Sequence, residues 1–143
     1  MMRRLAFAIW ELPQNALGAA NFAISGVLGR VERVARDRGR VMIELRSGAA
    51  VSLGAFVFWT RHDNPWVPVG EENRDHEFGH SIQSRLLGPL YLPFVGVPSS
   101  ARAMYAVAYR VVRGKRWAHY YDGYPESWAD RLGGADRSLR PRP

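Results

Sequence analysis

The stretch DHEFGHSIQS, residues 75–84, places two histidines four positions apart, with a glutamate directly after the first. Residues four apart lie on one face of a helix, so His76 and His80 can bind a single metal ion together. Glu77 can then accept a proton from a water that the metal has made more acidic. This HExxH spacing predicts a zinc-dependent hydrolase with two histidine ligands and a glutamate base. The same letters also fit an ordinary helix whose histidines are exposed or hydrogen-bonded in the core.

A catalytic zinc usually has three protein ligands and one position left for water. The chain has no cysteine, so the third ligand must be an imidazole or a carboxylate. Apart from the HExxH residues themselves, the candidates for this third ligand are His62, Asp75, His119, Asp122, Glu126 and Asp130. Asp75 precedes His76 on the same helix and points elsewhere, whereas His62 lies in an upstream loop and stays possible.

Glu126 has the most favourable context, because it begins a short helical segment in which Asp130 follows one turn later. This spacing lets Glu126 bind the metal while Asp130 accepts a hydrogen bond from the far nitrogen of a ligand histidine, which fixes the orientation of that ring. Without the HExxH segment, the same two residues would fit a helix start with a glutamate near the positive end of the dipole and a solvent-facing aspartate.

HEFGH followed by ESWAD resembles the gluzincin pattern HExxH…ExxA[ND], in which the later glutamate is a zinc ligand. The strings VSLGAFVFW, HEFGHSIQSRLLGPLYLPFVGVPS and YYDGYPESWADRLGG are similar to those of a family of small, uncharacterised bacterial proteins with HExGHxxQS, LGPLYL and TExWA-like segments. The resemblance spans about residues 50–134 and implies a metallopeptidase-like fold, with His76, His80 and Glu126 as zinc ligands and Glu77 as the base. Pro125 stands where a threonine is more usual, which should alter the entry into the helix rather than the ligand.

Several further polar residues lie near these motifs. Gln83 shares the metal-facing side of its helix, where it can hydrogen-bond beside the ligands, contact substrate or pack locally. A donor to the oxyanion of a tetrahedral intermediate is also expected. The loop before Glu126 offers His119, Tyr120, Tyr121 and Tyr124, of which His119 and Tyr124 are the favoured candidates. Gly79 is expected to allow close packing of another segment.

The elements around these motifs follow from periodicity and from turn residues. We expect helices over 12–38, 73–87, about 99–112 and 125–132, a β-hairpin over 40–59 that turns at Ser47-Gly48, and loops over 60–73 and 113–124. Ser99 or Ser100 should cap the third helix, and Gly54 should mark a bulge or a close backbone approach. The fold class is therefore α+β: a zincin-like domain over 1–134, with a hairpin or short sheet packed against the HExxH helix and two or three further helices. Residues 135–143 are expected to form a disordered tail.

The chain has 20 basic and 13 acidic residues, so its formal net charge is +7, and Lys115 is the only lysine. This charge favours an anionic partner or simply a solvated basic surface. The run Arg30, Arg33, Arg36, Arg38 and Arg40 is read as a solvated helix end or as a patch for lipid headgroups or nucleic acid. Nucleic acid is the less favoured partner because no recognisable binding motif is present. The apolar run in MMRRLAFAIW stops at Glu11, too short for a secretory signal. We therefore expect a cytoplasmic protein that can associate with an anionic membrane surface.

We expect a zinc metallopeptidase that acts on peptide or protein substrates. The strand GAAVSLGAFVF, residues 48–58, can hold an extended peptide by main-chain hydrogen bonds, or can be a buried core strand. The alternative is a non-catalytic, metal-stabilised interaction or membrane-surface module of the same fold, because so short a chain leaves little material for a deep cleft.

Overall fold

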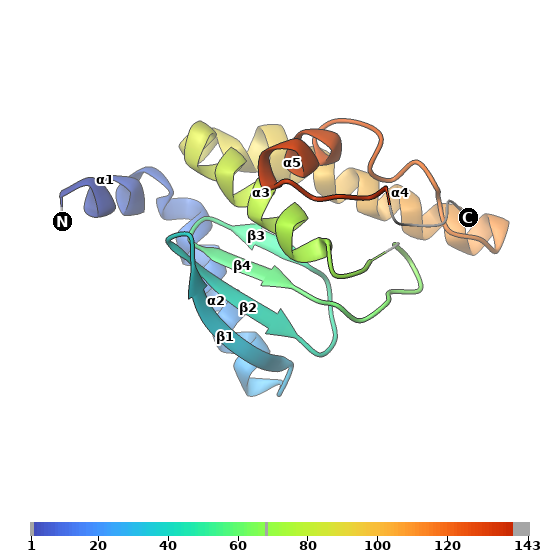
Figure 1. Ribbon diagram of the computed structural model, residues 1–143, viewed down its shortest axis with the longest axis horizontal. Helices are drawn as coiled ribbons and strands as arrows, with labels where there is room; N and C mark the ends of the chain where they lie inside the picture. The colour runs from blue at the N-terminus through green and yellow to red at the C-terminus, as the bar shows by residue number, and fades with distance from the viewer. Residues whose placement is uncertain (1, 68, 139–143) are drawn as a thin grey trace.

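The computed structural model describes residues 2–67 and 69–138 and has an α+β fold, as the sequence predicts (Figure 1). The elements, in chain order, are α1 (Met2–Trp10), α2 (Leu12–Val27), β1 (Val31–Asp37), β2 (Arg40–Leu45), β3 (Val51–Leu53), β4 (Phe56–Trp59), α3 (Asn73–Leu87), the 3₁₀ turn η1 (Gly88–Leu90), the π-helical turn η2 (Leu92–Gly96), α4 (Val97–Arg113) and α5 (Glu126–Gly133).

The strands form one sheet in the order β1-β2-β4-β3, in which β2 and β4 are parallel and the other neighbours are antiparallel. β1 and β2 are joined by Arg38-Gly39, whose φ angles of 48° and 78° are the positive values that a two-residue hairpin turn requires. β3 and β4 are joined at Gly54, with φ 63°. A β-carbon at Gly54 would lie 2.3 Å from the Asn15 amide oxygen, so the expected close approach is confirmed.

Two of the expected elements in this region are wrong. The helix predicted over 12–38 ends at Val27, and residues 31–37 form β1. Gly29, with φ 65°, interrupts the helix, and pairing with β2 then overrides the helical spacing of Val31 and Val34. The hairpin predicted to turn at Ser47-Gly48 is also absent, because β4 lies between β2 and β3 and the Ser47 segment only connects them.

The central strands β2 and β4 are covered on both faces, because their side chains alternate between the two faces and are buried on each, whereas β1 is mostly exposed. On one face, Ile43, Leu45 and Phe58 form a buried cluster against which Phe22 of α2 packs. On the other face, Met42, Val57 and Trp59 pack with Phe78 and Ile82 of α3. Figure 1 shows α2 behind the sheet and α3 in front of it. The HExxH helix therefore has one face fixed against the sheet.

A buried ion pair ties the N-terminal helices and β2 to α3. Arg40 lies 3.0 Å from the Glu11 carboxylate and also donates to the backbone oxygen of Ser81, at 2.5 Å. The Ser84 hydroxyl donates to the same carboxylate, at 2.8 Å. Arg40 is therefore buried rather than part of a solvated helix end, and the other arginines of that run lie on or beside β1 and its turn, not on a helix.

The expected HExxH helix is confirmed as Asn73–Leu87, and the loop before it has no regular structure where the structure describes it. The next helix was expected to begin at about residue 99, but residues 92–96 are already helical and α4 begins at Val97. Ser99 and Ser100 therefore do not cap this helix, because Pro98 occupies its first turn, where proline is well tolerated. Pro125 is the N-cap residue of α5, which ends at Gly133 and Gly134 as predicted.

Candidate metal centre

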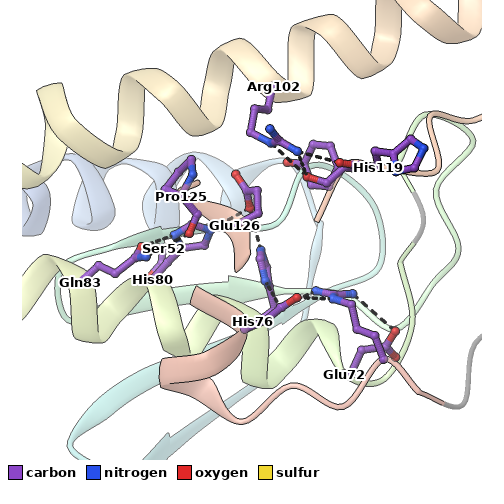
Figure 2. A network of polar contacts seen from close by, with 12 residues as sticks. Ser52, Glu72, His76, His80, Gln83, Arg102, His119, Pro125 and Glu126 are labelled. Atoms are coloured by element: carbon purple, nitrogen blue, oxygen red, sulfur yellow. Dashed lines mark hydrogen bonds and ion pairs between the residues drawn. The ribbon is translucent and has the colours of Figure 1, made fainter. Parts of the chain in front are cut away.

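His76, His80 and Glu126 converge on one point between α3 and α5. The Nε2 atoms of His76 and His80 lie 3.0 and 3.1 Å from the same carboxylate oxygen of Glu126, Oε2. All three side chains are buried, and Figure 2 shows both rings directed toward the carboxylate. The three ligand atoms lie within 4.8 Å of one another, so the group can hold a metal ion.

Two glycines bring the helices close enough for this convergence. A β-carbon at Gly79 of α3 would lie 1.9 Å from the backbone oxygen of Ala129, and one at Gly133 of α5 would lie 1.8 Å from the backbone oxygen of Asp75. No side chain could occupy either position without moving the backbone it faces. The expectation that Gly79 serves close packing is therefore confirmed, and this packing sets the depth at which Glu126 enters the site.

Asp130, one turn after Glu126, holds the other nitrogen of the His76 ring. Its Oδ1 lies 2.6 Å from His76 Nδ1, and Arg137 binds both carboxylate oxygens at 2.6 and 2.8 Å. The Arg137 guanidinium in turn lies 3.2 Å from the centre of the Tyr121 ring. Arg137 falls in the segment expected to be a disordered tail, of which residues 135–138 are described and residues 139–143 lie outside the described part.

Gln83 holds the corresponding nitrogen of His80. Its Oε1 lies 2.7 Å from His80 Nδ1, and its Nε2 donates to the backbone oxygen of Pro125 at 3.1 Å (Figure 2). Because the carbonyl of Pro125 can only accept, the Gln83 amide must present its oxygen to His80. This contact fixes a proton on His80 Nδ1 and leaves Nε2 as the acceptor when the ring is neutral.

The centre therefore brings several acceptors together without a donor between them. With both Nδ1 atoms donating to Asp130 and Gln83, the Nε2 lone pairs of two neutral rings face the Glu126 carboxylate. Three acceptors at this separation require extra protons or a cation. The second Glu126 oxygen, Oε1, is buried and has no hydrogen-bond partner among the described residues. Two imidazoles and one carboxylate are a donor set that suits Zn²⁺.

In the metal-free protein a proton takes this position. Burial disfavours the charged His76 ring, yet its hydrogen bonds to Asp130 and Glu126 outweigh burial and raise its pKa to about 9. Burial likewise opposes ionisation of Glu126, but the two histidine contacts outweigh it and lower the pKa of this carboxyl below its usual value. The site is thus built for a positive charge between the rings and the carboxylate.

Glu77 lies beside this group at the wall of a cavity of about 490 Å³. Its side chain is buried, and burial raises its pKa. Its Oε2 atom has no hydrogen-bond partner among the described residues. The cavity walls come from β3, α3, η2, α4 and the loop before α5, and include Val51, Leu53, Tyr91, Leu92, Val97, Met104 and Tyr120.

His119 and Tyr124, the favoured oxyanion donors, do not line this cavity. The His119 side chain is 71% exposed, and its Nδ1 lies 2.6 Å from Asp122. The Tyr124 hydroxyl donates to the backbone oxygen of Phe94 at 2.5 Å. The neighbouring Tyr120 lines the cavity instead, with 8% exposure, and burial raises the pKa of its hydroxyl.

The other candidate ligands are paired elsewhere. His62 lies 3.3 Å from Glu32, and Asp75 lies 2.8 Å from Arg38. Sequence reasoning did not identify Tyr91, whose hydroxyl donates to the backbone oxygen of Ser52 at 3.0 Å and so ties the LGPLYL segment to β3. It also did not identify Arg137, because no local pattern marks an arginine that folds back onto an aspartate of α5.

No family model matches this chain, and neither a curated protein nor a solved structure matches it. The evidence on function therefore comes from the residues of the centre and their geometry.

Proposed function

We propose that the protein is a zinc-dependent hydrolase of the gluzincin type, and that its substrates are peptides. The observation that supports this best is the convergence of two imidazole Nε2 atoms on the Glu126 carboxylate, with the buried Glu77 beside them at the wall of a cavity. The order of these residues in the chain, HExxH and then a glutamate with an aspartate one turn later, agrees with the resemblance to gluzincins.

His76, His80 and Glu126 are the residues that would hold the ion, with Asp130 and Gln83 orienting the two rings. A Zn²⁺ bound there supplies a Lewis acid that makes water more acidic and polarises a substrate carbonyl. The protein's own contribution is to keep both Nε2 lone pairs directed at one point, because each Nδ1 is committed to an acceptor.

Glu77 is the proposed general base. Burial raises its pKa, which increases its affinity for a proton near neutral pH. It would take a proton from the attacking water and return that proton to the nitrogen of the leaving amine. Tyr120 is better placed than His119 or Tyr124 to donate a hydrogen bond to the oxyanion, because it lines the cavity and its hydroxyl keeps its proton.

The edge strand β3 suggests how an extended peptide would bind. β3 pairs only with β4 in the described sheet, and residues 50–53 line the cavity next to the ligand histidines. A substrate strand could add to this edge through main-chain hydrogen bonds. The apolar walls contributed by Leu92, Val97 and Met104 suit an apolar side chain next to the scissile bond.

The test measures metal content and proteolysis on the purified chain. We expect about one zinc per chain and cleavage of a mixed peptide library. Glu77→Gln should keep the zinc and reduce cleavage by about 10²–10⁴-fold, the usual contribution of a general base. Glu71→Gln, an exposed glutamate outside the cavity, is the matched control and should cleave normally. Zinc binding without any cleavage would instead indicate a metal-stabilised, non-catalytic module, and absence of zinc binding would overturn both readings.

A further inference from the structure

The helix α2 packs Phe22 on the sheet but fully buries small or polar residues and exposes its large aliphatic ones. Its buried positions are Gln14, Gly18 and Ser25. Its large aliphatic residues face outward instead, with Ile24 57% and Val27 89% exposed. No residue from Leu12 to Val27 is charged. A surface helix normally buries its apolar stripe, so this exposed face calls for a partner.

Elements near α2 in the fold also expose apolar residues. α2 packs on η1, η1 on η2, and η2 on α4. In Figure 1, α2 lies behind the sheet and α4 behind α3 and α5, so both helices are on the far side of the molecule in that view. We define the apolar face by six of its exposed members: Leu17, Ile24, Val27, Phe94, Val97 and Val112. Large apolar residues exposed on several neighbouring elements in this way usually mark an interaction site.

The charges around the apolar face are mainly positive. Its helical elements and turns contain a single acidic residue, Glu11, which is buried against Arg40. No aspartate or glutamate occurs between Glu77 and Asp122. Arg30 is exposed just after α2 and Arg33 is exposed on β1, with the exposed Glu32 between them. Arg113 and Lys115 are exposed at the end of α4. The expected partner is therefore apolar where it meets the helices and anionic where it meets their ends.

We propose that the apolar face docks onto the surface of an anionic lipid bilayer. The aliphatic residues of α2, η2 and α4 enter the boundary of the acyl chains, and the flanking arginines bind headgroup phosphates. No described helix is long and apolar enough to cross the membrane, so the binding is interfacial. A second copy of the chain fits less well, because it would bring Arg30, Arg33, Arg113 and Lys115 of both copies together, and these outnumber the exposed Glu32 beside them.

Docking in this way would place the cavity next to the lipid. Val97 belongs to the apolar face and also lines the cavity. Met104 on α4 is 72% exposed and lines the cavity as well. Membrane binding itself does not depend on the zinc or on hydrolysis, so it can be tested whether or not the proposed activity is found.

The experiment is sedimentation of the full chain with phosphatidylcholine vesicles, with and without phosphatidylglycerol. We expect binding to the anionic vesicles that weakens with added salt and with removal of phosphatidylglycerol. The double variant Ile24→Glu/Val27→Glu should bind at least about tenfold more weakly. Arg131→Glu, on the exposed side of α5, changes the net charge by the same two units and should bind as the unmodified protein does.

Three results would overturn the proposal. The first is absence of binding of the unmodified protein to anionic vesicles. The second is equal loss for the double variant and for Arg131→Glu, which would indicate net charge alone. The third is a stable dimer, measured by analytical ultracentrifugation, that the double variant dissociates and that does not bind vesicles. Circular dichroism checks that each variant folds, and Val112→Glu on α4 provides an independent test if the α2 variant does not.

Discussion

Gln83 and His80 lie on adjacent positions of one face of α3, and the Gln83 amide bridges the His80 ring to the backbone of Pro125. Its oxygen is 2.7 Å from His80 Nδ1, and its nitrogen is 3.1 Å from the Pro125 oxygen. Pro125 directly precedes Glu126, so one side chain orients His80 on α3 and anchors the segment that carries Glu126 on α5. The two halves of the centre are thereby set relative to each other.

The contact between Asp130 and His76 predicts a specific loss of metal affinity. In the unmodified protein the Asp130 carboxylate orients the His76 ring and makes it more basic. Asp130→Asn removes this negative charge, so zinc affinity should fall by about 10–100-fold. Asp136→Asn is the matched control, since Asp136 is exposed and its described hydrogen bonds are to the nearby Ser138. Competition with a fluorescent zinc chelator measures both affinities. Equal affinities for the two variants would show that Asp130 does not support the ligand.

The close contact at Gly79 predicts a loss of stability. Gly79→Ala places a methyl group against the Ala129 backbone oxygen, so we expect a loss of about 3 kcal/mol in the free energy of unfolding together with weaker zinc binding. Urea unfolding measures the first quantity. Gly26→Ala, at a helical position with no atom within 4 Å of the added carbon, should instead raise stability slightly. A Gly79 variant as stable as that control would contradict the packing of α3 on α5.

The raised pKa of His76 predicts how zinc binding depends on pH. At pH 7 the ring of the metal-free protein is protonated, because its pKa is about 9, and zinc must displace that proton. Apparent affinity should therefore rise about tenfold per pH unit up to this pKa and then level off. Calorimetry in buffers of different ionisation enthalpy should detect the released proton. Zinc binding at pH 7 without proton release would exclude a protonated His76.

The same pKa shift has a consequence for the metal-free protein. The pKa of His76 is raised from 6.5 to about 9 in the folded protein, so protonation of this ring stabilises the fold fully below pH 6.5. This contribution to stability is lost as the pH rises through about 9. The melting temperature of the metal-free protein should fall over this range. Saturating zinc should reduce the dependence, because the metal replaces the proton.

The buried ion pair of Arg40 and Glu11 predicts the largest effect away from the metal centre. Arg40→Ala leaves the Glu11 carboxylate buried without its cation, which should cost about 3–5 kcal/mol of stability. Arg38→Ala removes a partly exposed arginine from its contact with Asp75 and should cost about 1 kcal/mol or less. Chemical unfolding of both variants gives the comparison, and similar losses would mean that the Glu11 pair does not anchor α3.

The group that can hold a metal ion could be predicted from the sequence, because the spacing within a helix directly fixes which side chains share a face. His76 and His80 follow from this rule alone, and Glu126 was favoured among six candidates because it begins a short helix with Asp130 one turn later. The contacts of Gln83 and Asp130 were also foreseeable, since each lies three or four residues from a ligand on its own helix.

The sheet could not be predicted in the same way, because its pairing depends on contacts distant in the sequence. Val31 and Val34 fit a helical stripe equally well, and only pairing with β2 places them in a strand. The insertion of β4 between β2 and β3 has no local signal at Ser47-Gly48. Arg137 and Tyr120 illustrate the same limit at the centre, since their positions follow from how the chain folds around α5.

We propose that His76, His80 and Glu126 bind one zinc ion. The most direct measurement is a crystal structure of the zinc-loaded protein with anomalous data collected on both sides of the zinc absorption edge. We predict a single anomalous peak coordinated by the two Nε2 atoms and a Glu126 oxygen, with Glu77 adjacent but not coordinated. A peak at other residues, or no peak with zinc in excess, would contradict zinc binding by these three residues.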